Sequence, residues 1–238
     1  MQKVILFLCL LFLSPSYSLQ GMAESDKPLP TVGSSGELAA GEQLFEEMQL
    51  GGIVNFIAFR EAVAGYHRIK QKNKSILTLI DFSKPSTEKR LFVFDMEKKT
   101  IIHSSLVAHG RNSGANYATS FSNKNGSYQS SLGFYLTENT YEGKNGYSLV
   151  LDGLEAGIND RAKERAIVIH GAAYANPSTI ASGRLGRSLG CPALPQALAK
   201  PIIDTIKKGS VIYIYANNEA YMAQSSILTG LRPARRHS

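Results

Sequence analysis

Seven short apolar runs between residues 76 and 216 constrain the fold of this chain more than any other feature. Each run is rich in Ile, Leu, Val, Phe or Tyr and is bounded by Gly, Ser, Asn, Asp or Lys, the pattern of β-strands separated by turns and loops. The expected strands are Ile76–Phe82, Leu91–Asp95, Ile101–Ala108, Gly133–Glu138, Tyr147–Asp152, Ala166–His170 and Ser210–Ala216. The sequence therefore predicts a mainly β domain.

Helical periodicity flanks and interrupts these strands. Glu37–Leu50 and Ile53–Lys70 place apolar side chains at helical spacing, which is typical of a core face, although their aromatic residues would also suit a groove for sugar. A third pattern, Leu198–Ile206, predicts one helix that begins or breaks at Pro201 and stops at Gly209. We expect N-terminal helices and a single helix beside the strands.

The two ends of the chain differ in composition from its middle. Residues 1–18 contain a lysine, a short apolar run and a small-x-small pattern, and are expected to be a removable signal peptide. Residues 19–36, rich in Ser, Gly and Pro, are expected to be a linker. Residues 37–70 are expected to form a helical segment that packs on the main domain. The main domain is expected to span residues 71–217, and residues 218–238 are expected to form a basic tail. The leading apolar run is too short for a membrane span, so the protein is expected to be secreted, periplasmic or associated with the cell wall.

Cys191 is the only cysteine outside the expected signal peptide, which contains Cys9. A single thiol in an exported protein cannot form an internal disulfide, so it is buried, paired with another chain, or reactive. The net charge of +7 suits an anionic partner. Because export is expected, cell-wall material or an anionic membrane surface fits this charge better than nucleic acid does.

His170 is the best candidate to activate the thiol. It ends the expected strand 166–170, and the 17 residues between it and Ser188 allow the chain to return and place Cys191 beside the imidazole. A thiol needs a base or a local positive field to become an effective nucleophile. Gly171 leaves the backbone free to adapt, so a main-chain carbonyl could hold the imidazole tautomer where other enzymes use a carboxylate.

The residues next to Cys191 are candidates for supporting roles. A developing oxyanion needs aligned donors, and Pro192 has no N–H, so the donors must come from Cys191, Gly190 or Leu189. Ser188 can hydrogen-bond within this turn or contact substrate.

Other polar residues are candidates for binding substrate. Arg184 and Arg187 could bind a substrate carboxylate or be solvated surface charges. The segment 110–131, full of Gly, Ser, Asn and Tyr, is expected to form a wall of the site or a surface loop. The candidate pocket residues are Asn116, Tyr117, Tyr135 and Tyr174, each of which would also suit the core.

The order of these motifs resembles the YkuD-like L,D-transpeptidase catalytic domain family, in its second subfamily. The resemblance covers roughly residues 50–217 and is carried by His170-Gly171 and Gly183–Pro192, and by Ile80–Pro85, Val107–Gly110, Asn116–Asn123, Gly146–Glu155 and Gly157–Asp160. It implies a mixed β-sandwich or barrel-like fold, with Cys191 as nucleophile, His170 as general base and acid, and Gly190 with Cys191 as the oxyanion turn. Better-known members have a second histidine where this chain has Leu189, and an arginine in the region of Pro192–Leu194.

The resemblance also implies a reaction. The Cys191 thiolate would attack the L-centre carbonyl of a diamino acid in a peptidoglycan tetrapeptide stem, and D-alanine would leave. An amine of a second stem would then form a 3-3 cross-link, or water would give an L,D-carboxypeptidase. Linkage to a wall-attached protein is a further alternative. No metal or organic cofactor is implied, and carbapenem-type inhibitors are expected partners.

Two readings outside this family stay open. His103, His109 and His170 could join Cys191 around zinc, although no close-spaced ligand pair such as HExxH is present. The protein could also be a non-catalytic wall-binding or scaffolding protein with a decayed site. An adduct on Cys191 after treatment with iodoacetamide or a carbapenem would favour the thiol enzyme, whereas sensitivity to chelators would favour zinc.

Overall fold

The computed structural model describes residues 32–231. The expected signal peptide and the last seven residues of the expected tail lie outside the described residues. Among the described helices, none has the length and apolar character needed to cross a bilayer.

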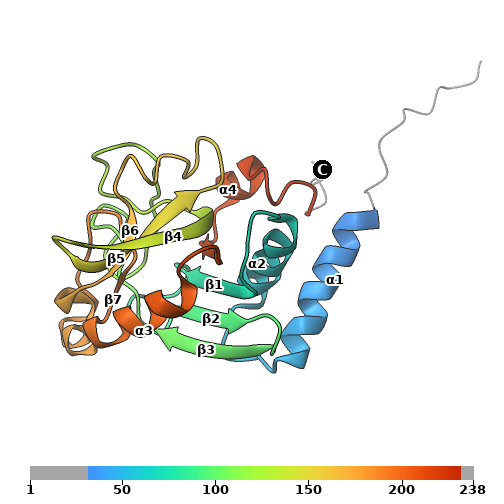
Figure 1. Ribbon diagram of the computed structural model, residues 1–238, viewed down its shortest axis with the longest axis horizontal. Coiled ribbons are helices and arrows are strands. Elements are labelled where there is room, and N and C mark those ends of the chain that lie inside the picture. Colours follow the sequence, from blue (N-terminus) through green and yellow to red (C-terminus); the bar gives the residue numbers. More distant parts are fainter. Residues whose placement is uncertain (1–31, 232–238) are drawn as a thin grey trace, which may run out of the picture.

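A single eight-stranded sheet forms the body of the protein, which confirms the predicted mainly β fold (Figure 1). Its order is β3-β2-β1-β8-β4-β5-β6-β7. The β1–β8 and β6–β7 pairs are parallel and the other pairs are antiparallel. The strands are β1 Ile76–Asp81, β2 Leu91–Asp95, β3 Thr100–Ser105, β4 Gly133–Gly143, β5 Gly146–Gly153, β6 Val168–Gly171, β7 Ala193–Leu194 and β8 Val211–Tyr215.

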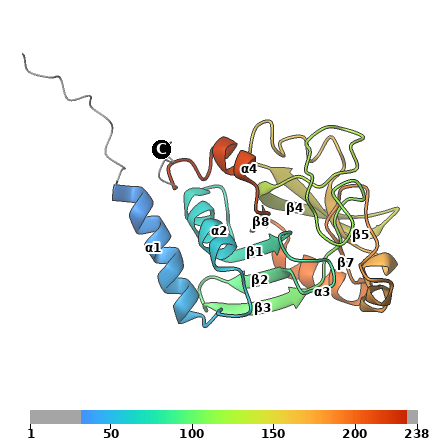
Figure 2. The same cartoon turned by 180° about the vertical axis from the view of Figure 1, so that it is seen from behind.

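The helices α2 and α3 pack against the sheet, and α3 connects β7 to β8. Seen from behind, α2 lies between α1 and β1 (Figure 2). Asn55 caps α2, because its side-chain oxygen accepts the N–H groups of Ile57 and Ala58 at 3.0 and 3.3 Å. The helices are α1 Val32–Glu47, α2 Phe56–Arg68, α3 Gln196–Ile206 and α4 Glu219–Gln224, with 3₁₀ turns at Ala173–Ala175 and Pro177–Ser182.

The two edges of the sheet meet and make it barrel-like. The chain leaves β3 and, at Ala108, exchanges backbone hydrogen bonds of 2.8 and 3.2 Å with Ala193 of β7. The Ser188 N–H donates to the carbonyl of His109 at 2.9 Å, and the Arg111 N–H donates to the carbonyl of Ser188 at 2.8 Å. We call these contacts between residues 108–111 and residues 188–193 the seam. Because residues after Ser105 pair across the seam, β3 is shorter than the predicted Ile101–Ala108. The seam also brings the segment after β3 against the turn that carries the cysteine.

A buried arginine holds one side of the seam. Arg90 is 0 % exposed, and its guanidinium donates to the carbonyl of Val107 at 3.0 and 2.7 Å and to that of Lys84 at 2.9 Å. It also lies 2.8 Å from Nδ1 of His109 and stacks over the Phe82 ring. Because a guanidinium only donates, Nδ1 accepts and Nε2 of His109 carries the proton. The segment that closes the sheet is thus fixed through its carbonyls and one neutral imidazole.

The stability of the protein is expected to fall in mild acid because of His109. Burial and the adjacent Arg90 charge lower the pKa of His109 to about 4, whereas the pKa of an unfolded histidine is about 6.5. Below about pH 6.5 the unfolded chain binds the proton and the folded chain does not, so the free energy of unfolding drops by about 3 kcal/mol as the pH approaches 4. Urea unfolding between pH 4 and 7 measures this loss. The His109→Gln variant should lose less unfolding free energy over this pH range than the wild type. An equal dependence of the unfolding free energy on pH in both proteins would contradict the assignment of this loss to His109.

The N-terminal helix and the end of the chain differ from the prediction. The helix α1 starts at Val32, within the expected linker, because packing of Leu38 and Phe45 against the core outweighs the low helix propensity of its Ser and Gly residues. Residues 218–231, expected as part of a basic tail, form α4 and a packed segment. Tyr221 is buried there and donates to Glu155 at 3.1 Å.

The boundaries of other predicted elements also change. The helix after the cysteine begins at Gln196 and contains Pro201, whose missing N–H removes only one bond of this short helix. The two-residue strand β7 was not predicted, since two residues carry no alternating pattern. Ala166, predicted to open β6, instead has a positive φ of 51°.

Candidate active site

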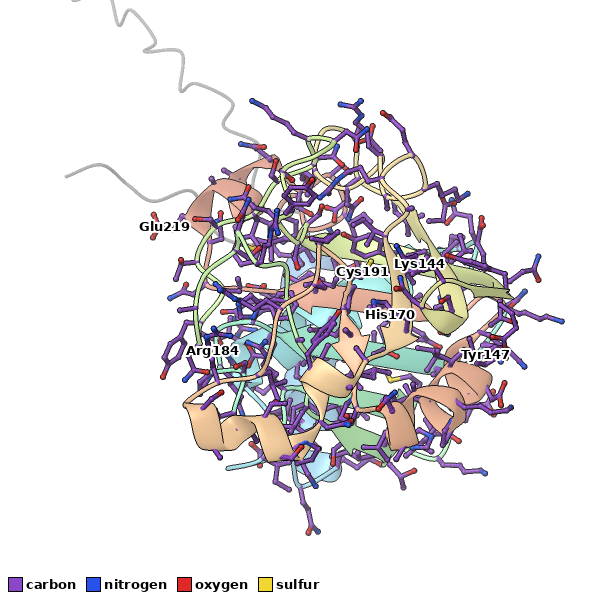
Figure 3. The ribbon with its side chains drawn as sticks, turned by 90° about the vertical axis from the view of Figure 1, so that its left-hand side faces the viewer. Lys144, Tyr147, His170, Arg184, Cys191 and Glu219 are labelled. Carbon is purple, nitrogen blue, oxygen red and sulfur yellow. The ribbon has the colours of Figure 1, made fainter. Side chains whose placement is uncertain are left out.

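Adjacent parallel strands bring His170 and Cys191 to the same place. His170 lies on β6 opposite Ala193 of β7, and Cys191 precedes Ala193 by two residues. The backbone N–H of Val168, two residues before His170, donates to Sγ of Cys191 at 3.5 Å. Residues two apart on a strand are about 7 Å apart, so the sulfur lies at the backbone of a residue one such step from His170. Figure 3 labels both residues near the middle of the molecule.

The imidazole of His170 is held by a main-chain carbonyl, as the sequence suggested. Its Nδ1 lies 3.0 Å from the carbonyl oxygen of Gly171. A carbonyl only accepts, so Nδ1 carries the proton and Nε2 keeps its lone pair. His170 is 4 % exposed, and burial lowers its pKa, with the Gly171 contact opposing this shift. The imidazole is therefore neutral at neutral pH and can accept a proton at Nε2.

The sulfur of Cys191 is close to backbone groups of β6 and the residues before it. The thiol points to the carbonyl of Ala166 at 3.6 Å and receives the Val168 N–H. Cys191 is 9 % exposed, and burial raises the pKa of its thiol, while the Val168 N–H and the charge of Arg165 act in the opposite direction. No hydrogen bond joins the sulfur to His170 among the described residues, so proton transfer requires the thiol to turn away from Ala166.

Ser188 builds the turn that presents the cysteine. Its hydroxyl donates to the carbonyl of Cys191 at 2.6 Å and accepts the N–H of Gly190 at 3.0 Å. The Gly190 N–H is therefore occupied, which corrects the expectation that Gly190 and Cys191 supply the oxyanion donors. Within residues 32–231, the N–H of Leu189 has no acceptor, and the N–H of Cys191 bonds to no other residue but acts on the residue's own thiol, lowering the thiol's pKa. These two remain the candidate donors of this turn.

Gly190 is required by close packing around the turn. Its φ is 130°, and a Cβ placed there would lie 2.9 Å from Cδ1 of Ile167 and 3.0 Å from the carbonyl oxygen of Gln129. On the other side, the hydroxyl of Ser130 donates to the Gly190 carbonyl at 2.9 Å. The segment 110–131 thus packs directly against the turn, as expected of a wall of the site.

Arg165 belongs to this site and was missed by the sequence reasoning. Its Nη2 would lie 3.5 Å from a Cβ on Gly190, and its charge acts on Cys191. The sequence carried a signal, since Arg165 directly precedes the apolar run that ends at His170. That signal was weak because Arg161 and Lys163 lie in the same basic stretch and are exposed.

The arginines proposed to bind substrate are engaged with backbone. Nη1 of Arg184 donates to the carbonyl of Leu185 at 2.9 Å. Nη1 of Arg187 donates to the carbonyls of Arg111 and Gly114 at 3.1 and 2.9 Å. Both are partly exposed and retain other N–H groups. Leu189, by contrast, is 59 % exposed beside Cys191 and presents an apolar side chain there.

The four candidate pocket residues have different surroundings. Tyr174 is near the thiol: burial raises its pKa to about 12, and the charge of Cys191 adds to the shift. Asn116 is structural, because its side-chain oxygen accepts the N–H and hydroxyl of Ser86 at 3.0 and 2.9 Å. Tyr117 is half exposed and lines a cavity of about 350 Å³ that none of residues 188–191 line.

Tyr135 corrects the prediction of a pocket residue. It is 0 % exposed and donates to the carbonyl of Ser131 at 3.1 Å. A fully buried ring on a central strand packs in the core and cannot touch a substrate. Alternation along a strand does not distinguish such a ring from one that faces a pocket.

The histidines considered for zinc are separated by their own contacts. His109 is bound to Arg90, and Nε2 of His103 lies 2.9 Å from the hydroxyl of Thr205. In the described part of the chain, no three His, Cys, Asp or Glu side chains are grouped so that they could hold a metal ion.

The turn before β7 thus carries a thiol near a neutral imidazole on β6, and a thiol with a base is the minimum for cysteine acyl transfer. Residues 51–215 match the L,D-transpeptidase catalytic domain, and the chain belongs to this family, in the second YkuD subfamily, as the sequence motifs suggested. The match agrees with the range of roughly 50–217 over which the motifs resemble the family, and it includes α2, which lies in the expected helical segment 37–70.

Solved structures of L,D-transpeptidases resemble the chain distantly. One from Mycobacterium smegmatis has a TM-score of 0.37 and 11 % identity, covering 60 % of this chain but only 59 % of its own. One from Stackebrandtia nassauensis has a TM-score of 0.37 and 14 % identity, covering 76 % and 78 %. A third, in complex with imipenem, has a TM-score of 0.37 and 12 % identity, covering 60 % of both chains. No curated protein matches the chain.

Proposed function

We propose that this protein is a murein L,D-transpeptidase, a cysteine acyltransferase acting on peptidoglycan tetrapeptide stems after export to the periplasm or cell wall. The observation that carries the proposal is the placement of His170 on β6 and of Cys191 on the turn that leads into the neighbouring parallel strand β7, in a chain of this family. The leading apolar run and the net charge of +7 support a location beside anionic wall polymer.

Acylation begins with the thiol. Sγ of Cys191 turns from the Ala166 carbonyl towards Nε2 of His170 and gives up its proton there. The thiolate attacks the L-centre carbonyl of the diamino acid, and the C–N bond to the terminal D-alanine breaks. The imidazolium returns its proton to the departing amine, and a thioester remains on Cys191.

The backbone of the turn stabilises the intermediate. The N–H groups of Cys191 and Leu189 bond to no other residue within residues 32–231 and are the proposed donors to the oxyanion. The Ser188 hydroxyl fixes the turn through hydrogen bonds to the Cys191 carbonyl and the Gly190 N–H. The oxyanion donors therefore move little when negative charge develops on the substrate.

The second half of the reaction takes an amine or water. His170 removes a proton from the side-chain amine of a second stem, and the amine attacks the thioester. The C–S bond breaks, the 3-3 cross-link forms, and the proton returns from His170 to the sulfur of Cys191. If water takes the place of the amine, the product is a tripeptide and the protein is an L,D-carboxypeptidase. The exposed Leu189 gives the entrance an apolar contact, which suits an acceptor chain better than water alone.

Purified protein incubated with tetrapeptide muropeptides tests the proposal. We expect cross-linked dimers and released D-alanine, detected by liquid chromatography and mass spectrometry, and an imipenem adduct on the peptide containing Cys191. Tripeptides without dimers would assign the carboxypeptidase. No product and no adduct would favour a non-catalytic wall-binding protein, and loss of activity with EDTA would favour a metal hydrolase.

A further inference from the structure

Arg165 ties one whole wall of the candidate site to the strand that carries the histidine. It lies three residues before β6, and all four of its hydrogen-bond acceptors belong to residues 122–131. The acceptors are the carbonyls of Ser122 and Gln129, at 2.8 and 2.6 Å, and the hydroxyls of Ser131 and Ser127, at 2.5 and 3.2 Å. This segment packs on Gly190, so Arg165 fixes the wall directly beside the nucleophile.

The guanidinium has no carboxylate partner in the described part of the chain. Its four acceptors are all neutral, and it takes part in none of the ion pairs there. Arg161, four residues earlier, is exposed and pairs with Glu164 at 2.7 Å. A half-buried cation without an anion is unfavourable, so its position needs a further explanation.

Two groups that can become anions act on Arg165, the phenol of Tyr135 and the thiol of Cys191, and a thiol is intrinsically the more acidic of the two. The effects are reciprocal: the charge of Arg165 lowers the pKa of Cys191, and a Cys191 thiolate raises the pKa of Arg165, although burial dominates both shifts in the opposite direction. The other titratable groups facing this place are His170 on β6 and the phenols of Tyr174 and Tyr135, which are neutral at physiological pH.

We propose that Arg165 is a positioning residue that supplies the counter-charge of the Cys191 thiolate while holding the 122–131 wall over it. This rests on the proposed role of Cys191 as nucleophile. The proton leaves the thiol for His170 or solvent, and the negative charge that remains on sulfur accepts the Val168 N–H, with the guanidinium beside the preceding residue, Gly190. A permanent cation thereby takes over part of the task usually left to an imidazolium.

The rate of iodoacetamide alkylation of Cys191, measured by mass spectrometry from pH 6 to 10.5, tests the proposal without any substrate. We compare wild type with Arg165→Met, Arg165→Lys and the matched control Arg161→Met. An opposite charge near a thiol lowers its pKa by about one unit or more, so Arg165→Met should react about tenfold more slowly on the rising limb, and its midpoint should move about one unit higher. Arg165→Lys should recover most of the midpoint, and Arg161→Met should keep the wild-type curve.

The shape of the curve separates charge from structure. Loss of the wall alone would change the plateau at high pH, where every thiol is ionised, and would move the midpoint down, because burial raises the pKa of the Cys191 thiol. An unchanged or lower midpoint in Arg165→Met, or an equal shift in Arg165→Lys, would overturn the proposal. Circular dichroism and the thermal midpoint verify that each variant is folded. Alkylation needs no muropeptide, so its result can be interpreted even if the transpeptidase assay gives no product.

Discussion

The Cys191→Ala variant is expected to form neither dimers nor tripeptides from tetrapeptide muropeptides, a loss of at least about 10⁴-fold. Without the sulfur there is no thioester, and no other thiol lies within residues 32–231 to replace it. The fold should be retained, because the lost side chain is small and the turn is held by Ser188. Product formation and the urea midpoint, measured on the same samples, check both statements.

Replacement of His170 is expected to reduce turnover nearly as much as replacement of Cys191. His170→Ala removes the group that accepts and returns the proton, and general acid–base catalysis contributes about 10²–10⁴-fold. His103→Gln provides the matched control, since His103 also lies on a strand but contacts Thr205 of α3 instead of the thiol region. Wild-type turnover in either Cys191→Ala or His170→Ala would refute the assignment of the site, and a large loss in His103→Gln would show that the assay responds to general damage.

The Arg90→Met variant is expected to lose about 3–5 kcal/mol of unfolding free energy. Arg90 is fully buried, and its removal leaves the carbonyls of Val107 and Lys84 and the Nδ1 of His109 without their donor. Methionine fills part of the volume over Phe82 but donates no hydrogen bond. Chemical denaturation with urea measures the loss.

A surface substitution serves as the comparison for Arg90→Met. Lys98→Met also removes one positive charge, but its side chain is 80 % exposed and its contact with Asp95 is long, at 3.9 Å. The expected change is within about 0.5 kcal/mol. If Arg90→Met were equally mild, the 106–111 segment would be held by its backbone bridges alone. A loss of alkylation at Cys191 in Arg90→Met would show that the seam supports the turn.

The strands could be predicted because their side chains carry the signal. The runs that became β1, β2 and β8 are apolar almost throughout, and the structure buries nearly every one of their residues. β7 is the opposite case: its two residues form a strand only because β6 and the 106–111 segment lie on either side. Elements defined by partners distant in sequence leave no local pattern.

The candidate site was predictable to a similar extent. Chemistry and spacing selected Cys191 and His170, and they also predicted that a carbonyl would hold the imidazole. The same reasoning failed for Tyr135, because the sequence pattern of a strand is the same whether its tyrosine faces the core or a pocket. It missed Arg165 because the importance of that residue lies in neutral loop atoms more than thirty residues away, which are near it only after folding.

The carbonyl that holds His170 comes from the neighbouring peptide unit rather than from a side chain. In a Ser-His-Asp triad, one codon change can delete the acid that orients the base, but here no substitution elsewhere in the gene can remove the orienting oxygen. The orientation of the imidazole therefore does not depend on the identity of any second side chain and is set by the course of the strand itself.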